Sequence, residues 1–236
     1  MSKIAPINAQ ISFETIDRHC VVVKTYRSGA RFNALQEYQA YLKLIEFLQE
    51  IDGVRVAKII KFSPSQNQLT IEKINVPTLQ EDLKRGNVSS LRKCRNRLMS
   101  VFLQASLKEL KFDSDPTNIF FDGNDIVIID PICQDIDIDD YTFVVFVWGI
   151  IKIIVRSWKL WNAPKLIAEV KRLVQCYSKK INRPNDDIIH QIIKYIDIVI
   201  EWNRERNQVE GILMYFFRKI VVVPIYRVIQ LILIRI

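Results

Sequence analysis

The alternation of apolar and polar positions divides the first 74 residues into strands and one helix. The run Cys20 to Lys24 predicts a buried strand that ends in a lysine, and Asn33 to Leu48 predicts a helix. Val54 to Phe62 and Leu69 to Ile74 predict two more strands, which a polar turn joins into a hairpin. Residues 1–74 are therefore expected to form a small β-rich lobe.

The pattern changes to mostly helical spacing in residues 75–210, which predicts a second, helical lobe. A short hairpin is expected over residues 119–129, where two apolar runs flank the turn sequence Asp-Gly-Asn-Asp. The apolar segment from Tyr141 to Trp161 predicts a buried helix. Two amphipathic stripes follow within residues 165–210, separated by the helix-breaking stretch Asn182 to Asn185. The expected fold class is α+β with two lobes.

The C-terminal segment, residues 211–236, forms a third region that is nearly continuously apolar. It contains no acidic residue and four cations, Arg218, Lys219, Arg227 and Arg235. A basic apolar segment of this kind can lie in the headgroup region of a membrane, which is the preferred interpretation. The alternative is a terminal element buried against the helical lobe. Tyr141 to Trp161 also approaches a membrane-spanning length, but its three cations favour a buried helix.

Composition indicates a folded chain with an anionic partner. Of the 236 residues, 49% are hydrophobic and 25% are charged, which argues against a disordered chain. The net charge of +8 favours an anionic partner, with an anionic membrane surface as one candidate. Nucleic acid is not expected, because no aromatic stacking motif is interleaved with the basic residues. The four cysteines are scattered, which fits reduced thiols and a cytoplasmic location, with peripheral attachment to the membrane as a further option.

Candidate chemistry is concentrated in residues 111–130. Asp113 and Asn118 come just before the first strand of the predicted hairpin, and Asp130 comes just after the second. All three side chains are therefore expected at the same end of the hairpin. Such a set can orient an attacking hydroxyl and hold Mg²⁺ ions that neutralise a transferring phosphoryl group. An ordinary hairpin is the alternative, and it explains the strands but not the convergence of the three polar residues.

This stretch resembles the catalytic loop of the protein-kinase-like superfamily, and more closely the aminoglycoside phosphotransferases and lipopolysaccharide-core kinases. Asp113 stands five positions before Asn118, and Asp130 follows twelve positions later. The resemblance implies that Asp113 is the catalytic base and that Asn118 and Asp130 are magnesium ligands. The chain departs from the family pattern in two places. Lys111 replaces the expected histidine, and Pro131 follows the metal-binding aspartate, as in several small-molecule kinases.

The resemblance also implies an ATP site in the first lobe. Lys24 and Glu37 are similar to the ion pair that holds the α and β phosphates, although separately each also fits an ordinary surface residue. Glu72 and Ile74 resemble the hinge segment that presents backbone groups to adenine. No glycine occurs in residues 11–18, so the Gly-rich phosphate cradle of typical kinases is absent.

The resemblance implies ATP- and Mg²⁺-dependent transfer of a phosphoryl group to a hydroxyl of a saccharide, lipid or other small or lipid-linked acceptor near a membrane. A pseudokinase that binds nucleotide or a protein partner without catalysis is the main alternative, favoured by Lys111. A membrane-associated helical adaptor is a third. About ten residues separate Asp130 from the next helix, as in compact kinases. Within them, Asp139 or Asp140 is expected either to brace the catalytic loop or to cap the helix.

Overall fold

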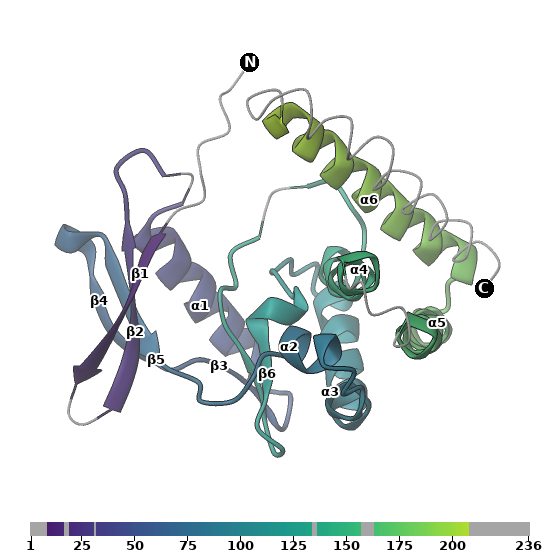
Figure 1. Cartoon of the computed structure of the whole chain (residues 1–236), viewed down its shortest axis with the longest axis horizontal. Coiled ribbons are helices and arrows are strands. Elements are labelled where there is room, and N and C mark those ends of the chain that lie inside the picture. Colours follow the sequence, from purple (N-terminus) through teal and green to yellow (C-terminus); the bar gives the residue numbers. More distant parts are fainter. Residues whose placement is uncertain (1–8, 17–18, 31, 134–135, 157–162, 208–236) are drawn as a thin grey trace.

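The computed structural model of the chain describes residues 9–16, 19–30, 32–133, 136–156 and 163–207. Its N-terminal part is a four-stranded antiparallel sheet with one long helix packed on it (Figure 1). The strands, in spatial order, are β1 (Ala9–Ile16), β2 (His19–Tyr26), β5 (Gln68–Glu72) and β4 (Ile59–Ser63). The helix is α1 (Ala34–Leu48).

Helix α1 begins where the sequence predicts it, because Asn33 is its N-cap. The Asn33 side chain accepts the backbone N–H of Gln36, and the Gln36 side chain accepts the N–H of Asn33, which forms a reciprocal capping box. Further along the helix, Tyr41 and Leu44 are fully buried. Strand β2 extends two residues beyond Lys24, so this lysine lies within the strand rather than at its end.

The prediction of one continuous strand from Val54 to Phe62 is wrong. The structure divides this run into β3 (Val54–Val56) and β4, which belong to different sheets. The N–H of Ala57 donates to Ile128 at 2.9 Å, whereas the carbonyl of the next residue, Lys58, accepts Glu72 N–H at 2.9 Å. The run from Val54 to Phe62 contains no turn residue between its two halves, so it carries no signal for such a change of partner.

The hairpin predicted over residues 119–129 is confirmed as β6 (Ile119–Phe121) and β7 (Ile126–Ile128). The Asp122 carboxylate forms its turn by accepting the backbone N–H groups of Asn124 and Asp125 at 2.9 and 2.8 Å. Strand β3 pairs in parallel with β7, which gives a second sheet in the order β3-β7-β6. This small sheet connects the predicted first lobe to the second, because β3 comes from one and the hairpin from the other.

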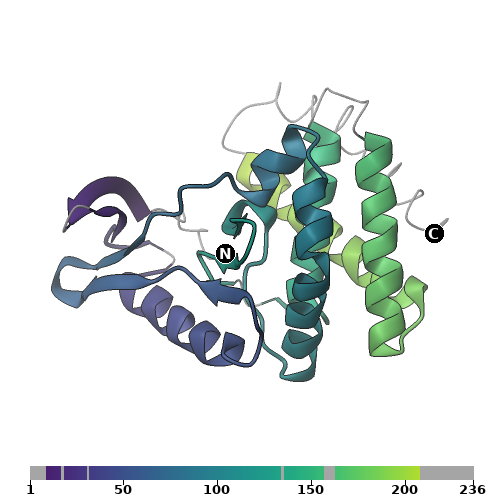
Figure 2. The same ribbon diagram turned by 90° about the horizontal axis from the view of Figure 1, so that it is seen from below.

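The C-terminal part is helical, as predicted. Helices α3, α4 and α5 lie side by side, and α6 crosses them (Figure 2). The helices are α2 (Leu79–Lys84), α3 (Ser89–Leu107), α4 (Tyr141–Arg156), α5 (Ala163–Ile181) and α6 (Asn185–Asn207), with short 3₁₀ turns η1 (Pro64–Gln66) and η2 (Pro116–Asn118). The predicted α+β class, with a small antiparallel sheet followed by a helical part, is therefore confirmed.

Amphipathic spacing correctly identified the buried faces of α5 and α6. Leu166, Val170 and Leu173 are buried on α5, and Ile188 and Ile192 are buried on α6. None of the helices in the described ranges is both long and apolar enough to cross a membrane. The segment 211–236, for which a membrane-surface anchor is predicted, lies outside the described residues.

Candidate functional site

The structure brings Lys24, Glu37 and Asp130 together from three separate elements. The Lys24 Nζ atom lies 2.5 Å from Glu37 Oε1 and 3.2 Å from Asp130 Oδ1. Lys24 is supplied by β2, Glu37 by the first turns of α1, and Asp130 by the segment after β7. The predicted pairing of Lys24 with Glu37 is therefore present, and the lysine also joins the residue predicted to bind metal.

Burial makes this cluster electrostatically unusual. The side chains of Lys24 and Glu37 are 6% and 0% exposed, whereas that of Asp130 is 50% exposed. Burial alone would lower the pKa of Lys24, but the carboxylates of Asp130 and Glu37 outweigh it and hold the pKa above its ordinary value. Burial raises the pKa of Glu37 against the opposing charge of Lys24. The lysine is thus a fixed cation, and the exposed side of Asp130 is open to a ligand.

The backbone of Asp130 adopts the left-handed conformation, with φ at 55°. This region is unfavourable for a residue with a side chain and is typically maintained by surrounding contacts. One such contact comes from Tyr41, whose hydroxyl accepts the Asp130 N–H at 3.2 Å. Sequence reasoning missed Tyr41. Its position four residues after Glu37 on the same face of α1 is the signal that could have found it.

Asn118 lies at the expected end of the hairpin. Its backbone carbonyl accepts the N–H of Ile129 at 2.9 Å, which places it beside the residue that precedes Asp130. Asn118 ends the turn η2, which Asp115 opens by accepting the Thr117 N–H at 3.1 Å. Pro116 occupies the first position of this turn, where the fixed φ of proline is favourable.

Asp113 is half-buried at the start of the same loop, and one of its carboxylate oxygens accepts the Asp115 N–H at 2.9 Å. Burial raises the pKa of Asp113 to about 7, and the nearby charges of Asp115 and Asp130 act in the same direction. The hydrogen bond from Asp115 and the charge of Lys152 oppose this rise. A carboxyl group that titrates near neutral pH is suited to accept a proton from an attacking hydroxyl.

Thr142, rather than the predicted Asp139 or Asp140, contacts the segment that carries Asp113. The Thr142 hydroxyl accepts the Phe112 N–H at 3.3 Å and donates to the Leu110 carbonyl at 3.2 Å. The Ser114 hydroxyl in turn donates to the carbonyl of Thr142. Thr142 thus contacts residues before and after Asp113. The signal in the sequence that could have found it is a polar residue within a mostly apolar helix.

Asp140 has a different role. Its carboxylate accepts hydrogen bonds from Ser106 at 2.6 Å, Tyr177 at 2.8 Å and Arg183 at 3.1 Å, so it connects α3, α5 and the loop after α5. Only its backbone carbonyl takes part in the start of α4, by accepting the Val144 N–H at 3.0 Å. The prediction that Asp139 or Asp140 braces the catalytic loop is therefore wrong, because three donors elsewhere take up the buried Asp140 carboxylate and Asp139 is exposed.

Helix α4 approaches the loop of residues 113–118 closely. A Cβ atom added to Gly149 would lie 2.1 Å from Cδ of Pro116 and 3.3 Å from Cγ of Asp115, so only glycine fits there. One turn further along the helix, the Lys152 amine forms an ion pair with Asp115. Lys111, which stands where the kinase-like families that the sequence resembles have histidine, donates its amine to the Ile136 carbonyl at 2.9 Å.

The predicted hinge residues lie at the end of β5. The Glu72 carboxylate accepts from Arg55 and from the Lys58 N–H, the latter at 2.8 Å, so this side chain is used within the protein. Ile74 lies two residues beyond the strand, where its backbone groups are outside the β ladder. Only backbone atoms of this segment are therefore candidates for contacting a nucleotide base.

Asn118 and Asp130 offer oxygen atoms that suit Mg²⁺. Groups of three or more His, Cys, Asp or Glu residues that could hold a metal are not found among the described residues. Mg²⁺ commonly binds one or two protein oxygens and completes its shell with water and substrate phosphates. The half-exposed Asp130 carboxylate uses only one oxygen for Lys24, so this donor set fits the ion.

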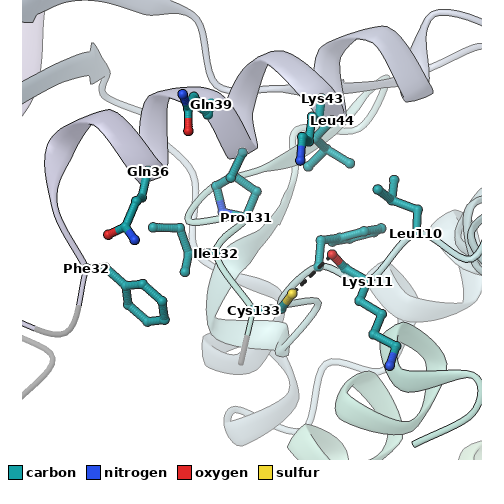
Figure 3. Close-up of a pocket in the computed structure, with 12 residues that line it drawn as sticks. Phe32, Gln36, Gln39, Lys43, Leu44, Leu110, Lys111, Pro131, Ile132 and Cys133 are labelled. Carbon is teal, nitrogen blue, oxygen red and sulfur yellow. Dashed lines mark hydrogen bonds between the residues drawn. The ribbon is translucent and has the colours of Figure 1, made fainter. Parts of the chain in front are cut away.

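A separate cavity of about 330 Å³ lies between α1 and two segments that flank the candidate site, residues 110–112 and 131–133 (Figure 3). Gln39 and Lys43 of α1 face Pro131 and Ile132 across it, and the Cys133 thiol contacts the carbonyl of Lys111. None of the seven predicted site residues lines this cavity. It therefore adjoins the elements that carry the site without being the site itself.

Comparison with known proteins found no relative that assigns a function. No family model matches the sequence, and a search of curated proteins found no match. Functional inference therefore rests on the cluster of Lys24, Glu37 and Asp130 and on its relation to Asp113 and Asn118.

Proposed function

We propose that the protein is an ATP- and Mg²⁺-dependent phosphotransferase that acts on a hydroxyl of a small acceptor, such as a saccharide or lipid. The observation that carries this proposal is the position of the Lys24 amine between Glu37 and Asp130. These residues are far apart in the sequence. Burying a lysine between a buried and a half-exposed carboxylate carries a desolvation cost, and groups perturbed in this way are concentrated at functional sites.

Each charged group has a role that its environment supports. Glu37 is fully buried and holds Lys24 in a fixed orientation, so the lysine can pair with phosphate oxygens as a preorganised cation. Asp130 and Asn118 would hold Mg²⁺, which when bound supplies positive charge that neutralises the phosphates. Backbone groups near Ile74 are the candidate contacts for adenine.

Asp113 would act on the acceptor. Its Oδ1 atom is engaged by the Asp115 N–H, which leaves the other oxygen to accept the proton of the acceptor hydroxyl. The acceptor oxygen forms a bond to the γ-phosphorus while the bond from that phosphorus to the β–γ bridging oxygen breaks. The electron pair of the broken bond leaves with ADP, and the hydroxyl proton passes to the Asp113 carboxylate.

A pseudokinase remains the second candidate, and Lys111 is the observation that favours it. Lys111 is tied to the Ile136 carbonyl and cannot supply the imidazole contacts of the related families. Nucleotide binding would then persist without transfer. The two candidates agree on Lys24 and Asp130 and differ only in whether Asp113 accepts a proton.

The first test is nucleotide binding to the full chain. Thermal unfolding should shift upward with ATP plus Mg²⁺, since a ligand at about 100 times its Kd adds about 2.7 kcal/mol to the free energy of unfolding. Asp130→Ala should remove the magnesium-dependent part of the shift. Asp52→Ala, which changes an exposed carboxylate in the turn before β3, is the matched control and should keep it. An unchanged melting temperature with MgATP in the unmodified protein would reject the enzyme and the nucleotide-binding pseudokinase.

The second test separates the enzyme from the pseudokinase. Asp113→Asn should keep the MgATP-dependent thermal shift and lower phosphoryl transfer by about a hundredfold or more, the usual contribution of a general base. Transfer is measured as ADP release with a panel of saccharide and lipid acceptors. Binding of MgATP by the unmodified protein, without ADP release for any acceptor or for water, would establish the noncatalytic alternative.

A further inference from the structure

Lys152 is a charged residue in the mostly apolar and buried middle part of helix α4. Its neighbours Ile151 and Ile153 are 1% and 2% exposed, and the Lys152 side chain itself is 22% exposed. Placing an ammonium group in such surroundings is costly unless a partner compensates the charge. The partner is Asp115 in the catalytic loop, whose side chain is 11% exposed.

Asp115 connects Lys152 to the proposed base. One of its carboxylate oxygens pairs with Lys152, and the other accepts both the N–H and the hydroxyl of Thr117, at 3.1 and 2.9 Å. Its own N–H donates to Asp113 Oδ1 at 2.9 Å. Both carboxylate oxygens and the amide of Asp115 are thus engaged, which fixes the backbone group that orients Asp113.

The contact depends on the close approach of α4 to the loop. Gly149 lies against Pro116, the residue after Asp115, and leaves no space for a Cβ atom. Lys152 is three positions further along the same helix, so it lies on the same side as Gly149. The glycine therefore brings the helix close enough for the lysine to reach the loop.

We propose that Lys152 is a positioning residue for the phosphotransfer reaction: through Asp115 it fixes Asp113 and balances the negative charge of the acceptor end of the site. This inference rests on the proposed function, since it assigns Lys152 a part in the work of Asp113. The carboxylates of Asp113, Asp115 and Asp130 would otherwise repel both one another and an incoming polyphosphate.

The groups that act on Asp113 come from four elements and make the inference testable. Asp115 of the loop and Asp130 after β7 are anions, and Lys152 of α4 is the cation. Tyr195 of α6 also interacts electrostatically with Asp113. Loss of the Lys152 charge should therefore raise the pKa of Asp113, and loss of the Asp115 charge should lower it. A purely structural contact would not produce shifts of opposite sign.

The experiment measures kcat/KM for MgATP-dependent transfer by the full chain from about pH 5 to 9. On the acid side of the profile, kcat/KM falls as Asp113 becomes protonated, and this part of the curve is the acidic limb. Lys152→Met should move the acidic limb to a higher pH by about one unit, which corresponds to a tenfold loss of rate at pH values below it. Asp115→Asn should move the limb to a lower pH. Lys152→Arg should restore the limb because it keeps the charge. Lys179→Met, at an exposed lysine in the last turn of α5, is the control and should leave the profile unchanged.

The inference would be overturned if Lys152→Met lost rate equally at every pH and its acidic limb stayed at the same pH. It would also be overturned if the acidic limbs of Lys152→Met and Asp115→Asn lay at the same pH. If Lys152→Met does not fold, the direction of the shift in Asp115→Asn decides the question. If the unmodified protein shows no transfer, the proposed enzyme fails separately. The inference is then judged by ¹³C NMR titration of the Asp113 carboxyl, assigned with Asp113→Asn, in the same variants.

Discussion

The half-buried Asp113 carboxyl predicts that removing its charge will stabilise the fold at alkaline pH. Burial raises the pKa of Asp113 from an ordinary value of 3.8 to about 7. The native state therefore binds this proton more tightly than the unfolded chain. Asp113 contributes a stabilisation that is fully present below about pH 4 and is lost as the pH rises to about 7.

The magnitude follows from the shift. Each pKa unit corresponds to about 1.4 kcal/mol, so a shift of about three units sets an upper limit of about 4 kcal/mol. Partial exposure of the side chain reduces this value, and we expect Asp113→Asn to gain about 1–3 kcal/mol at pH 8 relative to pH 5. Asparagine keeps the oxygen that accepts the Asp115 N–H, so the loop geometry should be preserved.

The assay is urea unfolding of Asp113→Asn and the unmodified protein at pH 5 and pH 8. The quantity of interest is the difference between the two proteins in the free energy of unfolding, because other titrating groups are common to both and cancel. Asp52→Asn, an exposed aspartate, is the control and should show no such difference.

The prediction is wrong if the difference in free energy of unfolding between Asp113→Asn and the unmodified protein is the same at pH 5 and pH 8. It also fails if the variant loses stability at pH 8, since that result would mean that the charged carboxylate is favourable where it lies. A gain in stability together with a loss of transfer would identify Asp113 as a residue that costs stability in return for function.

Three further predictions address the surroundings of the site. Gly149→Ala should lower the free energy of unfolding in urea by about 1–3 kcal/mol, because its Cβ would overlap Pro116; equal or greater stability would contradict the close approach of α4. Tyr41→Phe removes the acceptor for the Asp130 N–H and should cost about 1 kcal/mol and reduce the MgATP-dependent thermal shift, whereas an unchanged shift would show that Tyr41 does not hold Asp130. Deletion of residues 211–236 should release the chain from anionic vesicles in flotation without weakening MgATP binding; unfolding on deletion, with no vesicle binding by the full chain, would instead show that the segment belongs to the core.

The sequence by itself determined the features that depend on local pattern. The capping of α1 by Asn33, the hairpin after Asn118 and the buried faces of the C-terminal helices all follow from residue spacing over a few turns or strand pairs. The resemblance to kinase-like motifs also led to the prediction that Lys24 pairs with Glu37. That pairing joins two separate elements, so residue spacing without the resemblance would not have predicted it.

Only the tertiary structure decided how separate segments support that arrangement. The division of residues 54–62 between two sheets depends on which strand each half meets, and no turn residue within the run marks the change. Thr142 rather than Asp140 contacts the segment that carries Asp113, because three donors elsewhere take up the Asp140 carboxylate. The ion pair between Lys152 and Asp115 required the close packing of α4 on the loop at Gly149. Contacts of this kind form between elements whose relative positions are set by the whole core, so no local stretch of sequence records them.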